Sequence, residues 1–296
     1  MENVKNSNQE LLLEDKVAFI TGAGSGIGAA LAKGFAKYGA NIVLVGTTEE
    51  KLLQIQAEIE KIGRRALSIP LNVQNYEDLK QAFAKTMEKF GKIDILINNA
   101  GFSRLYPLNH PKCTPEILDN IIKTNVLGPL YGSHAVLSHM VFQGGGTILS
   151  TGSTIIGQPA PGWTVYSMSK SSLLGFTECL ALELKSQKIN VNLIMPRMVR
   201  TPMLRGMKED LINSMNPMMP EDLVDYYAFF ATKTGKKLTG QLVNVDKVEK
   251  IIGYARSLPK ENQNWADVKE WAEDTFSKEE FKKIKKMRKL IDFLLR

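Results

Sequence analysis

The 296-residue sequence is poor in the residues that build disulfide frameworks and metal centres. It holds two cysteines, Cys113 and Cys179, and three histidines. Two cysteines cannot staple a chain of this length, so we expect free thiols and a reducing compartment. No histidine has metal-ligand spacing with a cysteine or a carboxylate, and the sequence therefore predicts no metal site. The histidines are His110, His134 and His139.

Long apolar runs are also missing. No stretch of about 18 apolar residues occurs, which argues against a membrane-spanning helix. The first ten residues are polar and lack the apolar segment of a secretory signal. Hydrophobic residues make up 44% and charged residues 23% of the chain, as in ordinary globular proteins. We therefore expect a cytoplasmic protein with a well-filled core.

The net charge of +7 is concentrated at one end of the chain. Residues 277–296 hold eight basic and three acidic side chains, so the remainder is nearly neutral. A nearly neutral body is not typical of enzymes that bind nucleic acid, and we predict no nucleic-acid partner.

Short apolar runs alternate with stretches of helical period, a pattern typical of a parallel sheet covered on both faces. Right-handed crossovers then predict a doubly wound α/β domain over residues 1–247, followed by a helical extension over 248–296. The expected strands are 16–20, 41–45, 66–69, 93–97, 147–149, 190–194 and 242–245. The expected helices are 28–38, 49–62, 76–90, 115–142 with a break near Gly128, 166–185 and 221–231.

Two irregular stretches, 102–113 and 196–220, interrupt this alternation. Long loops in a compact α/β chain tend to be binding elements or lids. The second stretch is rich in methionine, an adaptable apolar residue that favours an apolar ligand surface. The alternative is that these side chains only fill the underside of the loop. They are Met198, Met203, Met207, Met215, Met218 and Met219.

A glycine-rich turn follows the first apolar run. Gly22 allows a tight turn, Gly26 allows the backbone to approach a pyrophosphate, and Gly28 allows close packing of helix on strand. The free N–H groups at the following helix start can hold a phosphate. Because the turn lies between a strand and a helix, it predicts dinucleotide binding rather than a purely structural loop.

The residues at the end of the second expected strand, 41–45, bear on the choice between NAD and NADP. A carboxylate there would bind the ribose 2′-hydroxyl and repel a 2′-phosphate. The sequence instead reads Val45-Gly46-Thr47-Thr48, with no carboxylate before Glu49. This favours NADP(H), with hydroxyls of Ser25, Thr47 or Thr48 and the Lys51 ammonium near the phosphate. No arginine stands at the expected place, and NAD(H) remains the alternative.

Tyr166 and Lys170 are four residues apart in a helical stretch, which places phenol and ammonium on one face. A free phenol titrates near pH 10, and a neighbouring cation lowers its pKa. The pair therefore predicts a general acid/base for a carbonyl or hydroxyl. Ser153, just after an expected strand, can hydrogen-bond the same carbonyl oxygen.

Taken in order, these motifs resemble the short-chain dehydrogenase/reductase family over residues 14–247. Thr21–Gly28 is similar to the family's TGxxxGxG turn, and Asn98–Gly101 to its NNAG motif. Leu238–Asp246 resembles its last strand. The residues at its four catalytic positions are Asn125, Ser153, Tyr166 and Lys170.

The resemblance implies a doubly wound (Rossmann) fold with a mostly seven-stranded sheet, direct hydride transfer without metal, and a homodimer or homotetramer. Tyr166 would exchange the proton, Ser153 orient the carbonyl, and Lys170 bind the nicotinamide ribose. Asn125 would hold a water that links Lys170 to solvent. Implied cofactor contacts are Gly22, Ser25, Gly26, Ile27, Gly28, Thr47, Asn72, Val73, Asn99, Ala100, Gly101, Tyr166, Lys170, Pro196 and Thr201.

The sequence departs from the family pattern in two places. The family usually has Pro-Gly after the sixth strand, whereas this chain has Pro196-Arg197. Arg197 or Arg200 could bind a substrate carboxylate or phosphate, because guanidinium binds such anions bidentately, or could be a solvated loop residue. The chain also continues 48 residues past Val248, where the family ends with Asp-Gly-Gly.

The extension is expected to form helices over 264–276 and 277–295. In the second, one stripe is apolar and lysines surround it: Phe281, Ile284, Met287, Ile291 and Leu294. We favour packing of this stripe on the domain or a sister subunit, with Trp265 and Trp271 as anchors. Contact with an anionic membrane surface or an acidic partner is the alternative.

These observations predict an NADP(H)-dependent oxidoreductase that interconverts a ketone and a secondary alcohol. Three alternatives remain: a nucleotide-sensing or scaffold protein without catalysis, an epimerase or dehydratase of nucleotide sugars, and a protein that binds a membrane surface or a partner through its tail. The four catalytic positions argue against the first. Epimerases and dehydratases of nucleotide sugars typically have TGxxGxxG spacing, and Ser25 stands at the place of its middle glycine, which argues against the second alternative.

Overall fold

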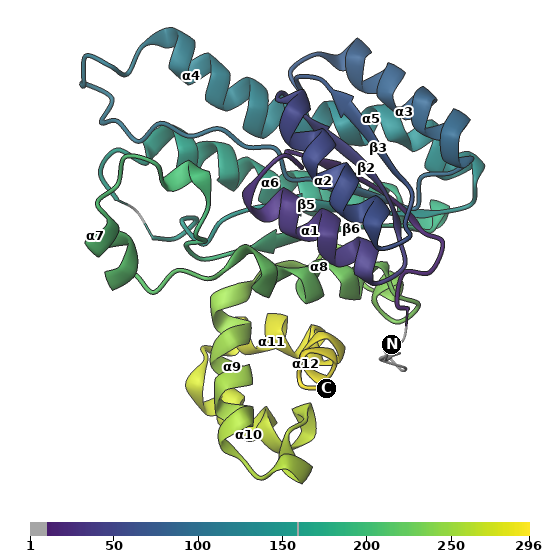
Figure 1. Ribbon diagram of the computed structural model, residues 1–296. Helices are drawn as coiled ribbons and strands as arrows, with labels where there is room; N and C mark the ends of the chain where they lie inside the picture. Colours follow the sequence, from purple (N-terminus) through teal and green to yellow (C-terminus); the bar gives the residue numbers. More distant parts are fainter. Residues whose placement is uncertain (1–10, 159) are drawn as a thin grey trace, which may run out of the picture.

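A seven-stranded parallel sheet lies at the centre of the structure, a computed structural model that describes residues 11–158 and 160–296 (Figure 1). The strand order is β3-β2-β1-β4-β5-β6-β7, as in a doubly wound fold. All seven predicted strands are confirmed, with bounds that move by one or two residues. The strands are β1 Val17–Thr21, β2 Asn41–Gly46, β3 Ala66–Pro70, β4 Ile95–Asn98, β5 Gly146–Thr151, β6 Ile189–Met195 and β7 Leu242–Asn244.

Helices cover both faces of the sheet, because alternate strand residues point to opposite sides. In β1, Ala18 and Ile20 join one core cluster while Val17 and Phe19 join the other. The first cluster is covered by α1 (Gly26–Lys37), α2 (Glu49–Lys61) and α8 (Val224–Ala231). The second is covered by α3 (Tyr76–Phe90), α5 (Gly128–Phe142) and α6 (Thr164–Glu183).

The helical stretch before β5 does not break at Gly128, as the sequence suggested. Helix α4 (Pro115–Ile122) passes into a π-helical turn over Lys123–Leu127, and α5 follows directly from Gly128. A π turn is an irregularity that keeps helical hydrogen bonding, and such turns often mark functional sites. Here the turn carries Asn125, whose side chain is fully buried.

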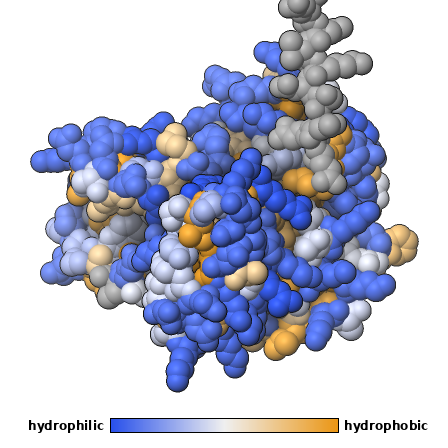
Figure 2. All heavy atoms as spheres, turned by 90° about the horizontal axis from the view of Figure 1, so that it is seen from below, coloured by the Kyte–Doolittle hydropathy of each residue, from blue (hydrophilic) through white to orange (hydrophobic). Residues whose placement is uncertain are grey.

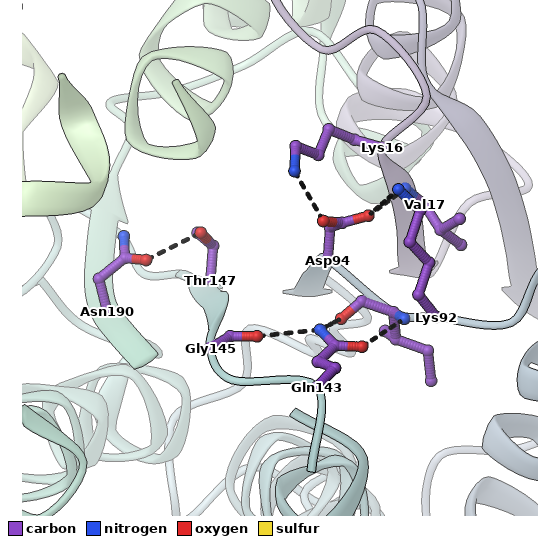
Figure 3. A network of polar contacts seen from close by, with 9 residues as sticks. Lys16, Val17, Lys92, Asp94, Gln143, Gly145, Thr147 and Asn190 are labelled. Atoms are coloured by element: carbon purple, nitrogen blue, oxygen red, sulfur yellow. Dashed lines mark hydrogen bonds and ion pairs between the residues drawn. The ribbon is translucent and has the colours of Figure 1, made fainter. Parts of the chain in front are cut away.

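A polar network closes the edge of the sheet where the strands begin (Figure 3). Asp94 accepts hydrogen bonds from the Lys16 ammonium at 2.8 Å and the Val17 N–H at 3.0 Å, and pairs with Lys92 at 3.3 Å. Burial opposes ionisation of Asp94, but these hydrogen bonds hold its pKa below the ordinary value. Nearby, Thr147 donates to Asn190 at 2.8 Å, so the network ties β1, β4, β5 and β6 together.

The C-terminal extension packs on the face covered by α1 and α8 (Figure 1). Helix α9 (Val245–Ser257) leaves β7 without a loop, and α10 (Trp265–Thr275) follows. The helix expected over 277–295 is two helices, α11 (Lys278–Lys286) and α12 (Arg288–Leu294), which meet at Met287.

The apolar stripe of α11 and α12 is turned inward, as the sequence favoured. Phe281, Ile284, Met287 and Ile291 are buried in the same cluster as α1 and α8, and Leu294 packs against it. Trp271 stacks on Tyr254 with centroids 4.2 Å apart. From the side of the extension the surface is mostly hydrophilic, with apolar spots that are small and separate (Figure 2). No helix of the described residues is long and apolar enough to cross a membrane.

Candidate active site

The glycine turn leaves β1 at the sheet's carboxyl edge and enters α1. Gly22 and Gly26 have φ values of +66° and +54°, a region that favours glycine. A Cβ on Gly28 would lie 2.2 Å from the Gly22 carbonyl oxygen, so close packing of helix on turn requires glycine there. The first N–H groups of α1 are left for a phosphate at the mouth of the turn.

A cleft of about 1470 Å³ runs along this edge of the sheet and collects most of the predicted site residues. All the predicted cofactor contacts line it except Gly28, which packs behind the turn. Of the four predicted catalytic residues, Ser153, Tyr166 and Lys170 line the cleft. Asn125 lies behind its wall.

The adenosine end of the cleft lies between the glycine turn and the start of α2. Thr47, Thr48 and Lys51 line it, and Lys51 Cβ lies 3.5 Å from the place of a Cβ on Gly24. Ser25 and Thr48 are the N-cap residues of α1 and α2, yet neither side chain makes a capping hydrogen bond. The hydroxyl residues Ser25, Thr47 and Thr48 and the Lys51 side chain are thus gathered at this end of the cleft.

The catalytic end is formed by α6 beside the end of β5. Tyr166 and Lys170 lie one turn apart on α6, with the Lys170 Nζ 5.8 Å from the centroid of the Tyr166 ring. Lys170 Nζ donates to the Thr151 carbonyl at 2.8 Å, and Trp163 packs edge-on against Tyr166. Both side chains are buried, so their orientation is fixed by packing as well as by hydrogen bonds.

Burial dominates the protonation of both groups. Desolvation raises the pKa of Tyr166 to about 12, although a hydrogen bond with Ser153 works in the opposite direction. Desolvation also lowers the pKa of Lys170 to about 8. The sequence predicted a lowered pKa for Tyr166, and that prediction is wrong for this arrangement, because loss of hydration outweighs the hydrogen bond with Ser153. The phenol is therefore held protonated, ready to donate.

Asn125 joins two segments of the catalytic end. Its amide nitrogen donates to the Phe102 carbonyl at 2.9 Å and to the Ser169 hydroxyl at 3.0 Å, and its oxygen accepts from the Phe102 N–H at 2.8 Å. The side-chain amide is thereby occupied by protein partners. It fixes the 102–106 loop against α6, next to Lys170.

The NNAG segment after β4 is held against β1. The Thr21 hydroxyl accepts from the backbone N–H groups of Asn99 and Ala100, each at 3.0 Å. The Asn99 amide nitrogen donates to the carbonyls of Thr21 and Gly22 at 3.0 and 3.4 Å. These bonds place the turn and the NNAG segment at a fixed separation.

Both irregular loops predicted as binding elements reach the cleft. The first contributes Phe102–Tyr106, and the second contributes four of its six methionines: Met198, Met203, Met207 and Met215. Met218 is instead a core residue, and Met219 is exposed. The second loop also contains a short helix, α7 (Glu209–Ser214), which the sequence did not predict.

The two arginines singled out in the sequence lie differently. Arg197 lines the cleft and donates to the Asn216 carbonyl. Arg200 is bound to α7 through Glu209 at 2.5 Å and through Asn213, and it does not line the cleft. Sequence reasoning assigned no site role to three further charged residues of the cleft: Arg104 and Arg205 belong to no motif, and Asp246 was matched only to the family's last strand.

Comparisons with known proteins agree with this geometry. A family model described as short chain dehydrogenase matches residues 16–212. The 3-oxoacyl-[acyl-carrier-protein] reductase FabG of Thermotoga maritima is 32% identical over 79% of this chain and 97% of its own. The 3alpha-hydroxysteroid dehydrogenase of Mediterraneibacter gnavus is 32% identical over 83% and 99%. These relatives thus leave about a fifth of this chain unmatched.

Solved structures show the same fold. A 3-ketoacyl-(acyl-carrier-protein) reductase of Brucella melitensis, complexed with NADH, is 33% identical with a TM-score of 0.73, covering 79% of this chain and 97% of its own. A short chain dehydrogenase of Burkholderia cenocepacia in complex with NADP is 31% identical with a TM-score of 0.72, covering 78% and 96%. The chain belongs to the short-chain dehydrogenase/reductase family, whose members are oxidoreductases that act on CH–OH groups with NAD(P).

Proposed function

We propose that the protein is an NADP(H)-dependent oxidoreductase that interconverts a ketone and a secondary alcohol. One observation carries the proposal: Ser153, Tyr166 and Lys170 line the same cleft as the glycine turn. The buried, protonated phenol of Tyr166 therefore lies in the same cleft, of about 1470 Å³, as the glycine turn. This is the arrangement that carbonyl reduction requires.

The residues of the cleft fit a nicotinamide dinucleotide. Glycine at positions 22 and 26 lets the turn pack closely on the segments that line the cleft, since a Cβ there would lie 2.9 Å from Ala100 or Thr201. Pyrophosphate would lie at the start of α1, adenine near Asn72 and Val73, and the nicotinamide near Pro196 and Thr201. When bound, the nicotinamide gives hydride to a carbonyl carbon or takes it from an alcohol carbon.

The chain's own residues handle the proton and the oxygen. Ser153 orients the substrate carbonyl by hydrogen bonding to its oxygen. Tyr166 gives its phenolic proton to that oxygen as the C–O double bond becomes a single bond, so a secondary alcohol results. Lys170, cationic below a pKa of about 8, stabilises the phenolate that remains until a solvent proton replaces the lost one. Alcohol oxidation reverses each step.

The preference for NADP(H) is supported by the end of β2. Thr47 and Thr48 offer hydroxyls and Lys51 an ammonium, and Asp246, the one carboxylate among the described lining residues, is remote in sequence from this strand. A ribose 2′-phosphate would meet donors there and no negative charge from β2 itself. The matched structures hold NADH in one case and NADP in the other.

The test is turnover of NADPH and NADH with a panel of apolar, acidic and sugar-like ketones. We expect NADPH oxidation with at least one ketone class, and Tyr166→Phe should lower kcat by about a hundredfold or more while NADPH still binds. Tyr76→Phe is the matched control, since its hydroxyl contacts His134 away from the cleft. A protein that binds NADPH without turning over any ketone would support the sensor alternative.

The expected homodimer or homotetramer has a candidate surface on α5 and α6. Phe142 at the end of α5 is 92% exposed, and Leu182 on α6 is 76% exposed. We propose that these two side chains belong to one apolar contact between subunits. Sedimentation of the protein, compared with Phe142→Asp and Leu182→Asp, tests the proposal, and an unchanged monomer in all three would contradict it.

A further inference from the structure

The charge balance of the cleft is strongly one-sided. Among its described lining residues, the single carboxylate Asp246 faces five cationic side chains: Lys51, Arg104, Lys170, Arg197 and Arg205. Lys51 lies beside the glycine turn, and Lys170 is held next to Tyr166. The proposed function therefore accounts for both lysines and leaves the guanidinium groups without a role.

All three guanidinium groups belong to the two irregular loops; Arg104 and Arg197 lie where these loops leave the catalytic end, and Arg205 follows eight residues after Arg197. The Pro196 carbonyl accepts from the Thr154 N–H at 2.9 Å, which places Arg197 next to the segment that carries Ser153. Arg104 follows Phe102, which Asn125 fixes against α6. Its guanidinium lies 4.9 Å from the Phe102 ring centroid and donates to the Ser103 carbonyl.

These arginines differ from those that serve structure elsewhere in the chain. Arg64 pairs with Glu14, and Arg200 pairs with Glu209. Arg104 and Arg197 bind only backbone carbonyls and have no carboxylate partner among the described residues. Each guanidinium carries five N–H donors, so most of its donors are left for a ligand. Arg197 also stands where the family usually has glycine.

Much of the remaining wall of the catalytic end is apolar, beside polar residues such as Ser103, Thr154 and Gln158. Large apolar side chains come from both loops and from the segment before α6: Tyr106, Ile155, Trp163, Met198, Met203 and Met215. Such a wall binds a hydrocarbon body, and a guanidinium within it binds a carboxylate or phosphate bidentately.

We propose that the substrate is an apolar carbonyl compound that also bears an acidic group, and that Arg197, assisted by Arg104, binds this group. The inference rests on the proposed function and defines its substrate class. The apolar body lies against the methionines and Trp163, the acidic group is held by the arginines, and the carbonyl then faces Ser153 and Tyr166. Only carbonyl compounds that have both an apolar body and an acidic group are turned over efficiently.

The probes are a homologous series of ω-benzoylalkanoic acids and their methyl esters, which share a ketone and differ in one negative charge. We expect kcat/KM with NADPH to be roughly ten- to hundredfold higher for the best acid than for its ester, the range of a charge-assisted hydrogen bond. Arg197→Gln should remove most of this ratio, mainly through KM. Arg104→Gln should remove part of it.

Arg200→Gln is the matched control, because it removes a neighbouring guanidinium that is occupied by α7. It should leave the ratio of acid to ester unchanged even if it loosens the loop. Equal turnover of acids and esters, or equal loss of the ratio in Arg197→Gln and Arg200→Gln, would overturn the inference.

Ligand binding is measured separately from turnover, so that failure of the oxidoreductase proposal can be distinguished from failure of acid recognition. Trp163 lines the cleft whereas Trp265 and Trp271 belong to the extension, so quenching of Trp163 fluorescence reports ligands. Absence of turnover with every ketone would contradict the oxidoreductase proposal alone. Tighter binding of acids than esters, lost in Arg197→Gln, would still support acid recognition, and equal affinity would refute it.

Discussion

Tyr227 on α8 and Thr151 at the end of β5 share a buried hydrogen bond of 2.8 Å between their hydroxyl oxygens. Its direction follows from the neighbours. The Asn99 amide nitrogen donates to the Thr21 and Gly22 carbonyls, so the Asn99 oxygen must accept the single Thr151 proton, at 3.2 Å. Tyr227 is therefore the donor.

This chain of hydrogen bonds runs from α8 to the glycine turn. Tyr227 fixes Thr151, Thr151 fixes Asn99, and Asn99 holds the carbonyl of Gly22. The Thr151 backbone carbonyl accepts from Lys170 at 2.8 Å, so the same residue also positions the Lys170 ammonium. Tyr227 is thus a positioning residue for both halves of the cleft.

Removing the Tyr227 hydroxyl should weaken coenzyme binding. Tyr227→Phe keeps the ring in the core and leaves Thr151 without its donor, so the turn and Lys170 lose part of their support. We expect the Kd for NADPH to rise about two- to tenfold, the size of one hydrogen bond. Titration of NADPH fluorescence well below the unfolding temperature measures this change.

Tyr226→Phe is the matched control for this prediction. Tyr226 is the adjacent residue of α8, equally buried, and its hydroxyl donates to Glu249 on α9 rather than toward the cleft. It should cost comparable stability and leave the Kd for NADPH unchanged. Equal effects of the two substitutions would show that Tyr227 acts through general stability alone.

The rate of ketone reduction should fall as the pH rises through about 8. The pKa of Tyr166 is raised to about 12, so the phenol stays protonated across this range. The pKa of Lys170 is lowered to about 8, so its ammonium is present below that pH and is lost above it. Loss of the cation removes the stabilisation of the developing phenolate. A pH profile of kcat/KM should be flat below about 8 and decline above it.

Lys170→Arg tests the assignment of this decline. Guanidinium does not lose its proton in the accessible range, so the variant should be slower but should keep its rate to higher pH. A profile with the same midpoint in both proteins would mean that another group causes the decline.

Most of the fold could be predicted from the sequence because its signal is local. The interior residues of β1 and β2 are continuous apolar runs, which predicted buried parallel strands, and the right-handed crossover rule predicted the doubly wound arrangement. The break expected near Gly128 is instead a π turn over Lys123–Leu127, which has no sequence signature distinct from helix. The helix expected over 277–295 was divided at Met287 by packing, which the stripe of apolar residues does not reveal.

Only part of the candidate site could be predicted, because some of its residues lie in motifs and others are brought to the cleft by tertiary packing. Motif residues such as Gly22 and Tyr166 have fixed spacing along the chain, so sequence identifies them. Arg104 and Tyr227 reach the catalytic end through tertiary packing of a loop and of α8, and no local pattern marks them. The direction of the Tyr166 pKa was missed because burial, unlike the spacing to Lys170, cannot be read from neighbouring residues.

Lys51 should contribute to the choice of coenzyme. Its ammonium lines the adenosine end beside the glycine turn, where a 2′-phosphate would lie. Lys51→Ala should raise the Kd for NADPH about three- to tenfold and leave the Kd for NADH unchanged. Lys61→Ala, at the end of α2 and outside the cleft, is the control. A similar loss for both coenzymes would contradict recognition of the 2′-phosphate.

The extension should unfold together with the sheet domain, although the sequence suggested a boundary at residue 247. Ile291 on α12 is fully buried in the cluster that includes α1 and α8, and Phe293 contacts Phe229 of α8. Ile291→Ala should therefore lower the free energy of unfolding of the whole chain by about 2–4 kcal/mol. The exposed neighbour Lys289→Ala should change it by less than about 0.5 kcal/mol.

Calorimetry with and without NADPH distinguishes one folding unit from two. If the chain is one folding unit, Ile291→Ala should shift a single transition to lower temperature. NADPH should then raise the temperature of that transition, because the coenzyme binds only the folded cleft. If the extension is a separate folding unit, the substitution should create an additional transition at lower temperature, and NADPH should leave the temperature of that transition unchanged. Because the coenzyme binds only the folded cleft, Ile291→Ala in one folding unit should also weaken apparent NADPH binding near its unfolding midpoint, an effect that an independent extension could not produce.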